Sequence, residues 1–189
     1  MSPHAVKGNL LVYRGSDSFR QRLVLSILSG KPVQIVDIRI SQDEPGLREY
    51  EVSFIRLLDK ITNGTIVELN ETGTEVFFQP GLLNGGFIEH DCCVQRSIGE
   101  YSNNILQYNF FDNKLCVTNE LVGYYLEVLL MLGFFCKENL KAVLRGVTCN
   151  SLDPSVDHIK TSVLPLMKRF VIDDEGIDLK INKRGVHFD

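Results

Sequence analysis

The chain lacks the cysteine spacing of a disulfide framework or a zinc site. It has five cysteines, an odd number, and no CxxC pair among them, whereas such sites normally use even numbers or closely spaced pairs. We therefore expect reduced thiols. The N-terminus has no charged segment followed by an apolar run, and no uninterrupted apolar stretch approaches the length of a bilayer crossing. These absences predict a soluble protein of the cytoplasm or nucleus.

Charge is too evenly balanced to indicate nucleic-acid binding by itself. The net charge is -4 over 189 residues. The first 60 residues carry nine Lys or Arg against seven Asp or Glu, and the remainder carries 11 against 17. The N-terminal third is therefore the better place to seek an anion site. Hydrophobic residues make up 44% of the chain, which is ample for a packed core.

The first 84 residues predict a β-α-β-α-β-β unit. The expected elements are a strand at 10–13, a helix at 17–29, a strand at 32–38, a helix at 49–62, and a hairpin of strands 66–69 and 75–79. Ser16 is expected to cap the first helix, and Gly30 to end it.

A looser copy of this order follows. It comprises a strand at 85–91, a helical run at 125–135, an apolar segment at 140–144 and a helical run at 155–170. Arg39 and Arg145 follow equivalent strands, 106 positions apart. The chain therefore reads as α/β (α+β), with a first repeat over residues 1–84 and a second over 85–189.

Several phrases resemble the RNA 3'-terminal phosphate cyclase family, and more closely its cyclase-like nucleolar branch. They are FRQRLVLSILSGKPV, EPGLREYEVSFIRLLDKITNG, FFQPGLLNGGFIEHDC, YYLEVLLML, LRGVT and DPSVD. The resemblance implies repeated α/β units with helix pairs packed on sheets.

The chain departs from the catalytic cyclases where the resemblance places their chemistry. Tyr13 stands at the family's glutamate, and the family's Gly-rich turn is replaced by Arg14, Gly15 and Ser16. Arg20 and Arg39 match active-site arginines of the family. The next such arginine corresponds to Gln42, and the family's glutamine after the PGLR phrase corresponds to Tyr50.

The family's histidine nucleophile belongs to a C-terminal part that would lie beyond Asp189. Without a nucleophile no covalent nucleotidyl intermediate can form. We therefore expect no enzyme activity and no cofactor.

The chain keeps arginines that can bind phosphate, because a guanidinium group has a planar set of N–H donors that can bind a phosphodiester at two points. The candidates are Arg20, Arg39, Arg48 and Arg145. Arg39 is the strongest, since it follows a buried-type strand and ligand sites favour such strand ends. The competing interpretation is that each is an ordinary surface or salt-bridged arginine.

No metal site is expected. The run from Glu89 to Cys93 contains residue types that bind metals, but successive residues of a strand point to opposite faces and cannot converge on one ion. His158 is expected to be solvated or associated with a helix cap rather than to act as a general base.

Residues 100–123 form a 24-residue insert relative to the family, and subtracting it reduces the repeat spacing from 106 to 82 positions. We expect it to be a translated intron, because Gly99, Glu100 and Tyr101 can be encoded by a splice-donor-like string. The family's small inserted domain and last repeat are expected to be absent. Their absence predicts exposed apolar surface and poor solubility for the chain alone.

The resemblance implies a role in small-subunit rRNA processing and ribosome biogenesis in the nucleus and nucleolus. The implied partners are precursor rRNA, the small-subunit processing complex and a nucleolar GTPase. Two alternatives stay open. The chain could be an RNA-processing enzyme, either an endonuclease or a residual cyclase, or it could be a nonfunctional truncated isoform.

Overall fold

The computed structural model describes residues 10–92, 122–146, 154–170, 177–182 and 184. Helices and strands are mixed in open sheets, which confirms the predicted α/β class. The chain divides into two compact units, one formed by residues 1–88 with 128–142 and the other by residues 89–127 with 143–189. The boundary of the sequence repeats at residue 84 stays a prediction. No helix in the described ranges is long and apolar enough to span a membrane.

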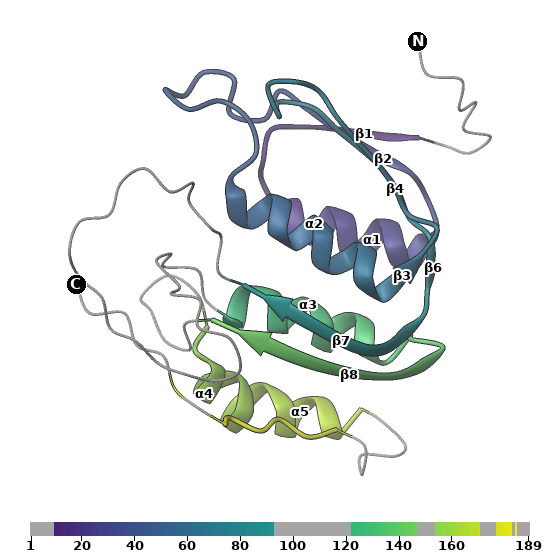
Figure 1. Cartoon of the computed structure of the whole chain (residues 1–189), viewed down its shortest axis with the longest axis vertical. Coiled ribbons are helices and arrows are strands. Elements are labelled where there is room, and N and C mark those ends of the chain that lie inside the picture. Colours follow the sequence, from purple (N-terminus) through teal and green to yellow (C-terminus); the bar gives the residue numbers. More distant parts are fainter. Residues whose placement is uncertain (1–9, 93–121, 147–153, 171–176, 183, 185–189) are drawn as a thin grey trace. The chain divides into compact units, whose positions relative to one another are not determined.

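The first unit is built on a four-stranded sheet, seen above two helices in Figure 1. Its strands are β1 (Leu11–Arg14), β2 (Val33–Val36), β4 (Ile66–Leu69) and β5 (Val76–Gln79), in the order β1-β2-β5-β4. β1 and β2 are parallel and the other pairs are antiparallel. A parallel pair needs a crossover, and helix α1 (Phe19–Ser29) supplies it. All the strands and the hairpin predicted for this part are confirmed.

Helix α1 begins two residues later than predicted, and its N-cap is Ser18 rather than Ser16. Ser18 has a φ of 51°, and its carbonyl accepts the backbone N–H of Arg22 at 3.0 Å. The residues before it are held in a turn, so Ser16 lies outside the helix. Gly30 ends the helix with a φ of 67°, as predicted.

Helix α2 (Glu49–Ile61) matches the predicted 49–62 to within one residue, and Thr62 is its C-cap. Its apolar side is fully buried at Phe54, Leu57, Leu58 and Ile61. The sheet contributes alternating inward residues of β2 and β5, where Val33 pairs with Phe78 and Ile35 with Val76. This face forms the core of the first unit. Beyond α2, the short strands β3 (Thr62–Asn63) and β6 (Leu82–Leu83) pair antiparallel.

A second strand–helix–strand succession consists of β7 (Gly85–Asp91), α3 (Val122–Gly133) and β8 (Glu138–Arg145). β7 has the predicted bounds, and α3 starts inside the predicted insert, at Val122. Figure 1 shows β7 and β8 side by side with their arrows pointing the same way. The rest of the insert lies outside the described residues.

The predicted helical run at 155–170 is also confirmed, with a local irregularity. It consists of α4 (Val156–His158), the π-helical turn η1 (Ile159–Val163) and α5 (Leu164–Lys168). Pro165 lies in the first turn of α5, and its missing N–H is compatible with a local change of hydrogen-bond pattern before it.

Candidate anion-binding site

The loop that follows β2 holds the strongest predicted site residue in an unusual backbone conformation. Asp37 and Arg39 have φ values of 58° and 49°, a region that favours glycine and costs a side chain free energy. Backbone bonds hold the residue between them, since Ile38 donates to Thr74 at 3.0 Å and accepts from Gly46 at 2.9 Å. Ile38 is itself fully buried. The loop is therefore fixed at both ends and directs Arg39 toward the start of α2.

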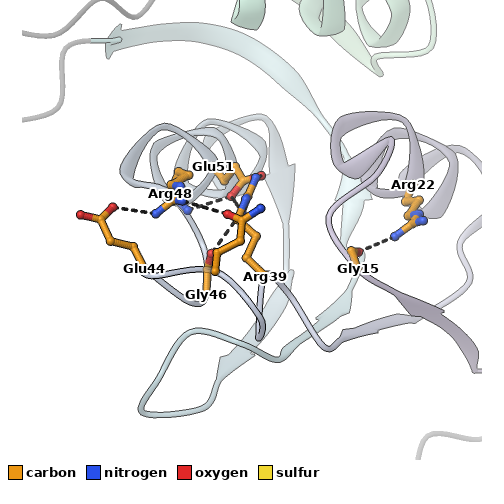
Figure 2. Close-up of polar contacts among 8 residues, drawn as sticks. Gly15, Arg22, Arg39, Glu44, Gly46, Arg48 and Glu51 are labelled. Carbon is orange, nitrogen blue, oxygen red and sulfur yellow. Dashed lines mark hydrogen bonds and ion pairs between the residues drawn. The ribbon is translucent and has the colours of Figure 1, made fainter.

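Arg39 is bound by a carboxylate of the same unit (Figure 2). Its Nη1 and Nη2 donate to the two carboxylate oxygens of Glu51 at 2.7 and 2.8 Å, and Nη1 also donates to the carbonyl of Gly46 at 3.1 Å. The side chains are only 12% and 3% exposed. This bidentate geometry is the strongest form of charged hydrogen bond, so Arg39 fits the competing interpretation of a salt-bridged arginine.

Glu51 also completes the N-terminus of α2. It is the third residue of the helix, and its carboxylate accepts the backbone N–H of Arg48 at 2.8 Å. A glutamate at this position commonly satisfies the free donors of the first turn, and the helix dipole favours its negative charge. One carboxylate therefore joins the loop after β2 to the first turn of α2.

The side chain of Arg48 extends outward from the same point. Its Nη1 donates to Glu44 at 2.8 Å and its Nη2 to Gln42 at 3.1 Å. Arg48 is 30% exposed and Glu44 is 84% exposed, so water screens this pair and it contributes little to stability. Gln42, which the resemblance aligns with a family arginine, accepts this hydrogen bond through its side-chain oxygen.

The turn between β1 and α1 is closed by an arginine to which the sequence assigned no role. The Arg22 guanidinium carbon lies 4.8 Å from the centre of the Tyr13 ring. Its Nη1 donates to the carbonyl of Gly15 at 2.8 Å, as Figure 2 shows. Tyr13, at the family's glutamate position, thus offers an aromatic face to a cation.

Two of the four predicted arginines contact one carboxylate, but only one of them does so through its guanidinium. The Arg39 side chain and the Arg48 backbone N–H both donate to Glu51, whereas Arg20 lies half-buried in the first turn of α1. Arg145 belongs to the second unit, where its Nη2 lies 3.0 Å from the Glu89 carboxylate, with both side chains almost half exposed. Binding of phosphate by these residues stays a prediction.

Within the described ranges, no three metal-binding side chains form a group. In β7, His90 is buried while Glu89 and Asp91 are exposed. The predicted alternation is thus confirmed where it can be seen; Cys93 lies outside the described residues.

His158 is an exposed residue of α4. Its backbone N–H donates to the Ser155 side chain at 3.1 Å, and this bond caps α4. That the His158 side chain is solvated or cap-associated stays a prediction. The neighbouring Asp157 pairs with Arg184, whose Nη2 lies 2.9 Å from one carboxylate oxygen. That hydrogen bond lowers the pKa of Asp157 and raises the pKa of Arg184.

A unit of this topology, with an open mixed sheet and two helices packed beside it, falls in the α/β class. Residues 11–188 match the family described as RNA 3'-terminal phosphate cyclase. The chain belongs to this family, as the sequence phrases predicted.

Three relatives define the similarity further. The chain is 54% identical over 188 residues to the "Probable RNA 3'-terminal phosphate cyclase-like protein" of Drosophila melanogaster, covering 98% of this chain and 42% of the relative. It is 51% identical over 182 residues to the "RNA 3'-terminal phosphate cyclase-like protein" of Homo sapiens, covering 96% and 42%. It is 38% identical over 179 residues to the "rRNA processing protein rcl1" of Schizosaccharomyces pombe, covering 94% and 42%. The chain thus spans about 42% of the length of these relatives.

Sequence reasoning missed Glu51 and Arg22 as members of this region. A signal for Glu51 was available, because a glutamate at the third position of a predicted helix commonly caps it. No comparable local signal exists for Arg22, because its two partners lie on the preceding strand and turn.

Proposed function

We propose that this chain is a non-catalytic RNA 3'-terminal phosphate cyclase-like protein that acts in small-subunit rRNA processing and ribosome biogenesis. The proposal draws on the names of its relatives, which are called cyclase-like or, in Schizosaccharomyces pombe, an rRNA processing protein. The observation that carries the non-catalytic part is the Arg39–Glu51 pair, in which both terminal nitrogens of the guanidinium are already bound by a carboxylate.

The main alternative is an RNA-processing enzyme. An assay for cyclisation decides between them: purified chain is incubated with 3'-phosphorylated RNA and ATP, and a catalytic cyclase serves as the positive control. We expect no cyclic phosphate end and no adenylated protein. Formation of either product above the background of a heat-denatured sample would overturn the non-catalytic proposal, and cutting of precursor rRNA would favour an endonuclease.

RNA contact is proposed for Arg20, Arg39, Arg48 and Arg145. Arg48 and Arg145 hold exposed ion pairs, which exchange readily for a phosphodiester because water already screens them. Binding of single-stranded RNA is measured by fluorescence anisotropy across a salt series. Each lost phosphate contact should lower the salt slope by roughly 0.7.

The variants for this measurement are Arg48→Ala and Arg145→Ala, with Arg56→Ala as the matched control. Arg56 is an exposed arginine on α2, so its removal changes the net charge equally. Equal slopes for all three variants would refute site-specific contact.

The partners proposed are precursor rRNA, the small-subunit processing complex and a nucleolar GTPase, and the proposed location is the nucleolus of the nucleus. A pull-down with the purified GTPase tests whether this chain retains that function. Capture by the chain supports the proposal, whereas no capture together with no RNA binding supports the alternative of a nonfunctional chain. A fluorescent fusion tests the location.

A further inference from the structure

We infer that Glu51 fills an anion seat, and that a phosphate group takes the same seat when the carboxylate is removed. The seat is formed by the Arg39 guanidinium and the backbone N–H of Arg48. This inference deepens the RNA-binding part of the proposed function, because it names the residue that controls access of a phosphate to Arg39.

The donors of the seat are arranged for an oxyanion with two or more oxygens. Arg39 supplies two parallel N–H groups, one to each oxygen of Glu51, at 2.7 and 2.8 Å. The Arg48 backbone N–H adds a third donor to one of those oxygens at 2.8 Å. A guanidinium fork binds phosphate in the same bidentate way as carboxylate. A free N–H at the start of a helix also favours either anion.

Contacts other than those with Glu51 also hold these donors. Arg39 is anchored by its own bond to the Gly46 carbonyl and by the hydrogen-bonded loop around Ile38. The Arg48 N–H is fixed by the first turn of α2, a helix of 13 residues. Removing the carboxylate therefore leaves the Arg39 guanidinium and the Arg48 N–H in place, and the guanidinium loses the group that binds both of its terminal nitrogens.

The consequence for the unaltered chain is that a phosphate can reach Arg39 only by displacing the Glu51 carboxylate. Glu51 is attached to the seat by its own helix and therefore has a high effective concentration there. A free phosphate, and equally an RNA phosphate, must compete with it. Arg48 differs, because its side chain points to Glu44 and Gln42 outside the seat.

Anion rescue of stability tests this inference. The variant is Glu51→Ala in the full chain, and the matched control is Glu49→Ala, which removes an exposed carboxylate from the same first turn of α2. Thermal melts are recorded in sodium phosphate and in sodium chloride at equal ionic strength. At about ten times the dissociation constant for phosphate, we expect the Tm of Glu51→Ala to rise by roughly 3–5 °C. The unaltered chain and Glu49→Ala should shift by less than about 1 °C on the same scale.

Two further variants keep the inference falsifiable. Glu51→Gln removes the charge but keeps an acceptor oxygen, so it serves if Glu51→Ala does not fold; it should bind inorganic phosphate about tenfold more tightly than the unaltered chain in calorimetry. The double variant Arg39→Met with Glu51→Ala removes the seat and its buried charge together, and it should show no phosphate rescue.

The inference fails if Glu51→Ala and Glu51→Gln gain no more from phosphate than Glu49→Ala, or if the double variant is rescued equally. Because the probe is inorganic phosphate, this outcome is separate from a failure of RNA binding. If the chain binds RNA but phosphate does not raise the Tm of Glu51→Ala, the proposed function stands and the inferred phosphate seat is refuted.

Discussion

Gly85 offers a sharp test of how β7 and β8 come together. It has a φ of 83°, and a Cβ built on it would lie 2.8 Å from the Cys136 Cβ and still closer to the Glu138 carbonyl oxygen. Glu138 is the first residue of β8. Both the backbone conformation and the space therefore require glycine, which gives a structural reason for the NGG sequence in one of the phrases shared with the family.

Gly64 is the matched control, because it has the same φ of 83° but no atom within 4 Å of the added Cβ. Substitution by alanine in this backbone region costs about 1–2 kcal/mol at either position. At Gly85 the steric conflict adds about 1–3 kcal/mol. Gly85→Ala should therefore destabilise the first unit by about 2–5 kcal/mol and Gly64→Ala by about 1–2 kcal/mol.

The assay is urea unfolding followed by far-UV circular dichroism, with both glycines in the same compact unit. The close approach of β8 to Gly85 would be refuted if the free energies of unfolding of Gly85→Ala and Gly64→Ala agreed within about 0.5 kcal/mol. Differences larger than this can be resolved between mutations at separate sites.

Three other outcomes are expected. Phe54→Ala should cost about 3–5 kcal/mol in urea unfolding because the ring is fully buried, whereas Val12→Ala, at a side chain 58% exposed, should stay within about 0.5 kcal/mol. Arg184 lowers the pKa of Asp157, so the folded carboxyl gives up its charge at a lower pH than the unfolded one. The stability gap between the unaltered chain and Asp157→Asn should be constant at neutral pH and shrink below about pH 4; a gap unchanged down to pH 3 would contradict this. Burial raises the pKa of the Cys136 thiol, so peptide mapping after iodoacetamide treatment at pH 8 should show slower labelling there than for a short unstructured cysteine peptide.

The regular elements were predictable because their signals are local. A run of apolar and β-branched residues marked β2, a turn between two short strand candidates marked β5, and the apolar periodicity of α2 located that helix to within one residue. The start of α1 was misplaced because Ser18 adopts a positive φ and Arg22 binds the Gly15 carbonyl. The preference for serine at a helix N-cap does not distinguish Ser16 from Ser18. The choice depends on the turn, which the Arg22 side chain closes from the following helix.

The candidate site was predicted only as a region. The rule that ligand sites lie beyond strand ends led to the loop after β2, and it named Arg39 correctly as a residue of that loop. The partner was missed, since Glu51 is 12 positions away and on another element. The loop that carries Arg39 to Glu51 includes positive φ values at Asp37 and Arg39. Such values cannot be predicted from residue type.

The Arg39–Glu51 pair also limits what a matching arginine can mean. Removing one partner of a buried ion pair costs several kcal/mol, because the remaining buried charge loses that partner. Arg39 and Glu51 are therefore bound to each other as a structural pair, and Arg39 has a reason to be present without any substrate. A family arginine kept at this position cannot alone indicate RNA binding. RNA binding at Arg39 would instead be indicated if phosphate displaced the Glu51 carboxylate from the guanidinium. That displacement depends on Glu51 rather than on the presence of the arginine.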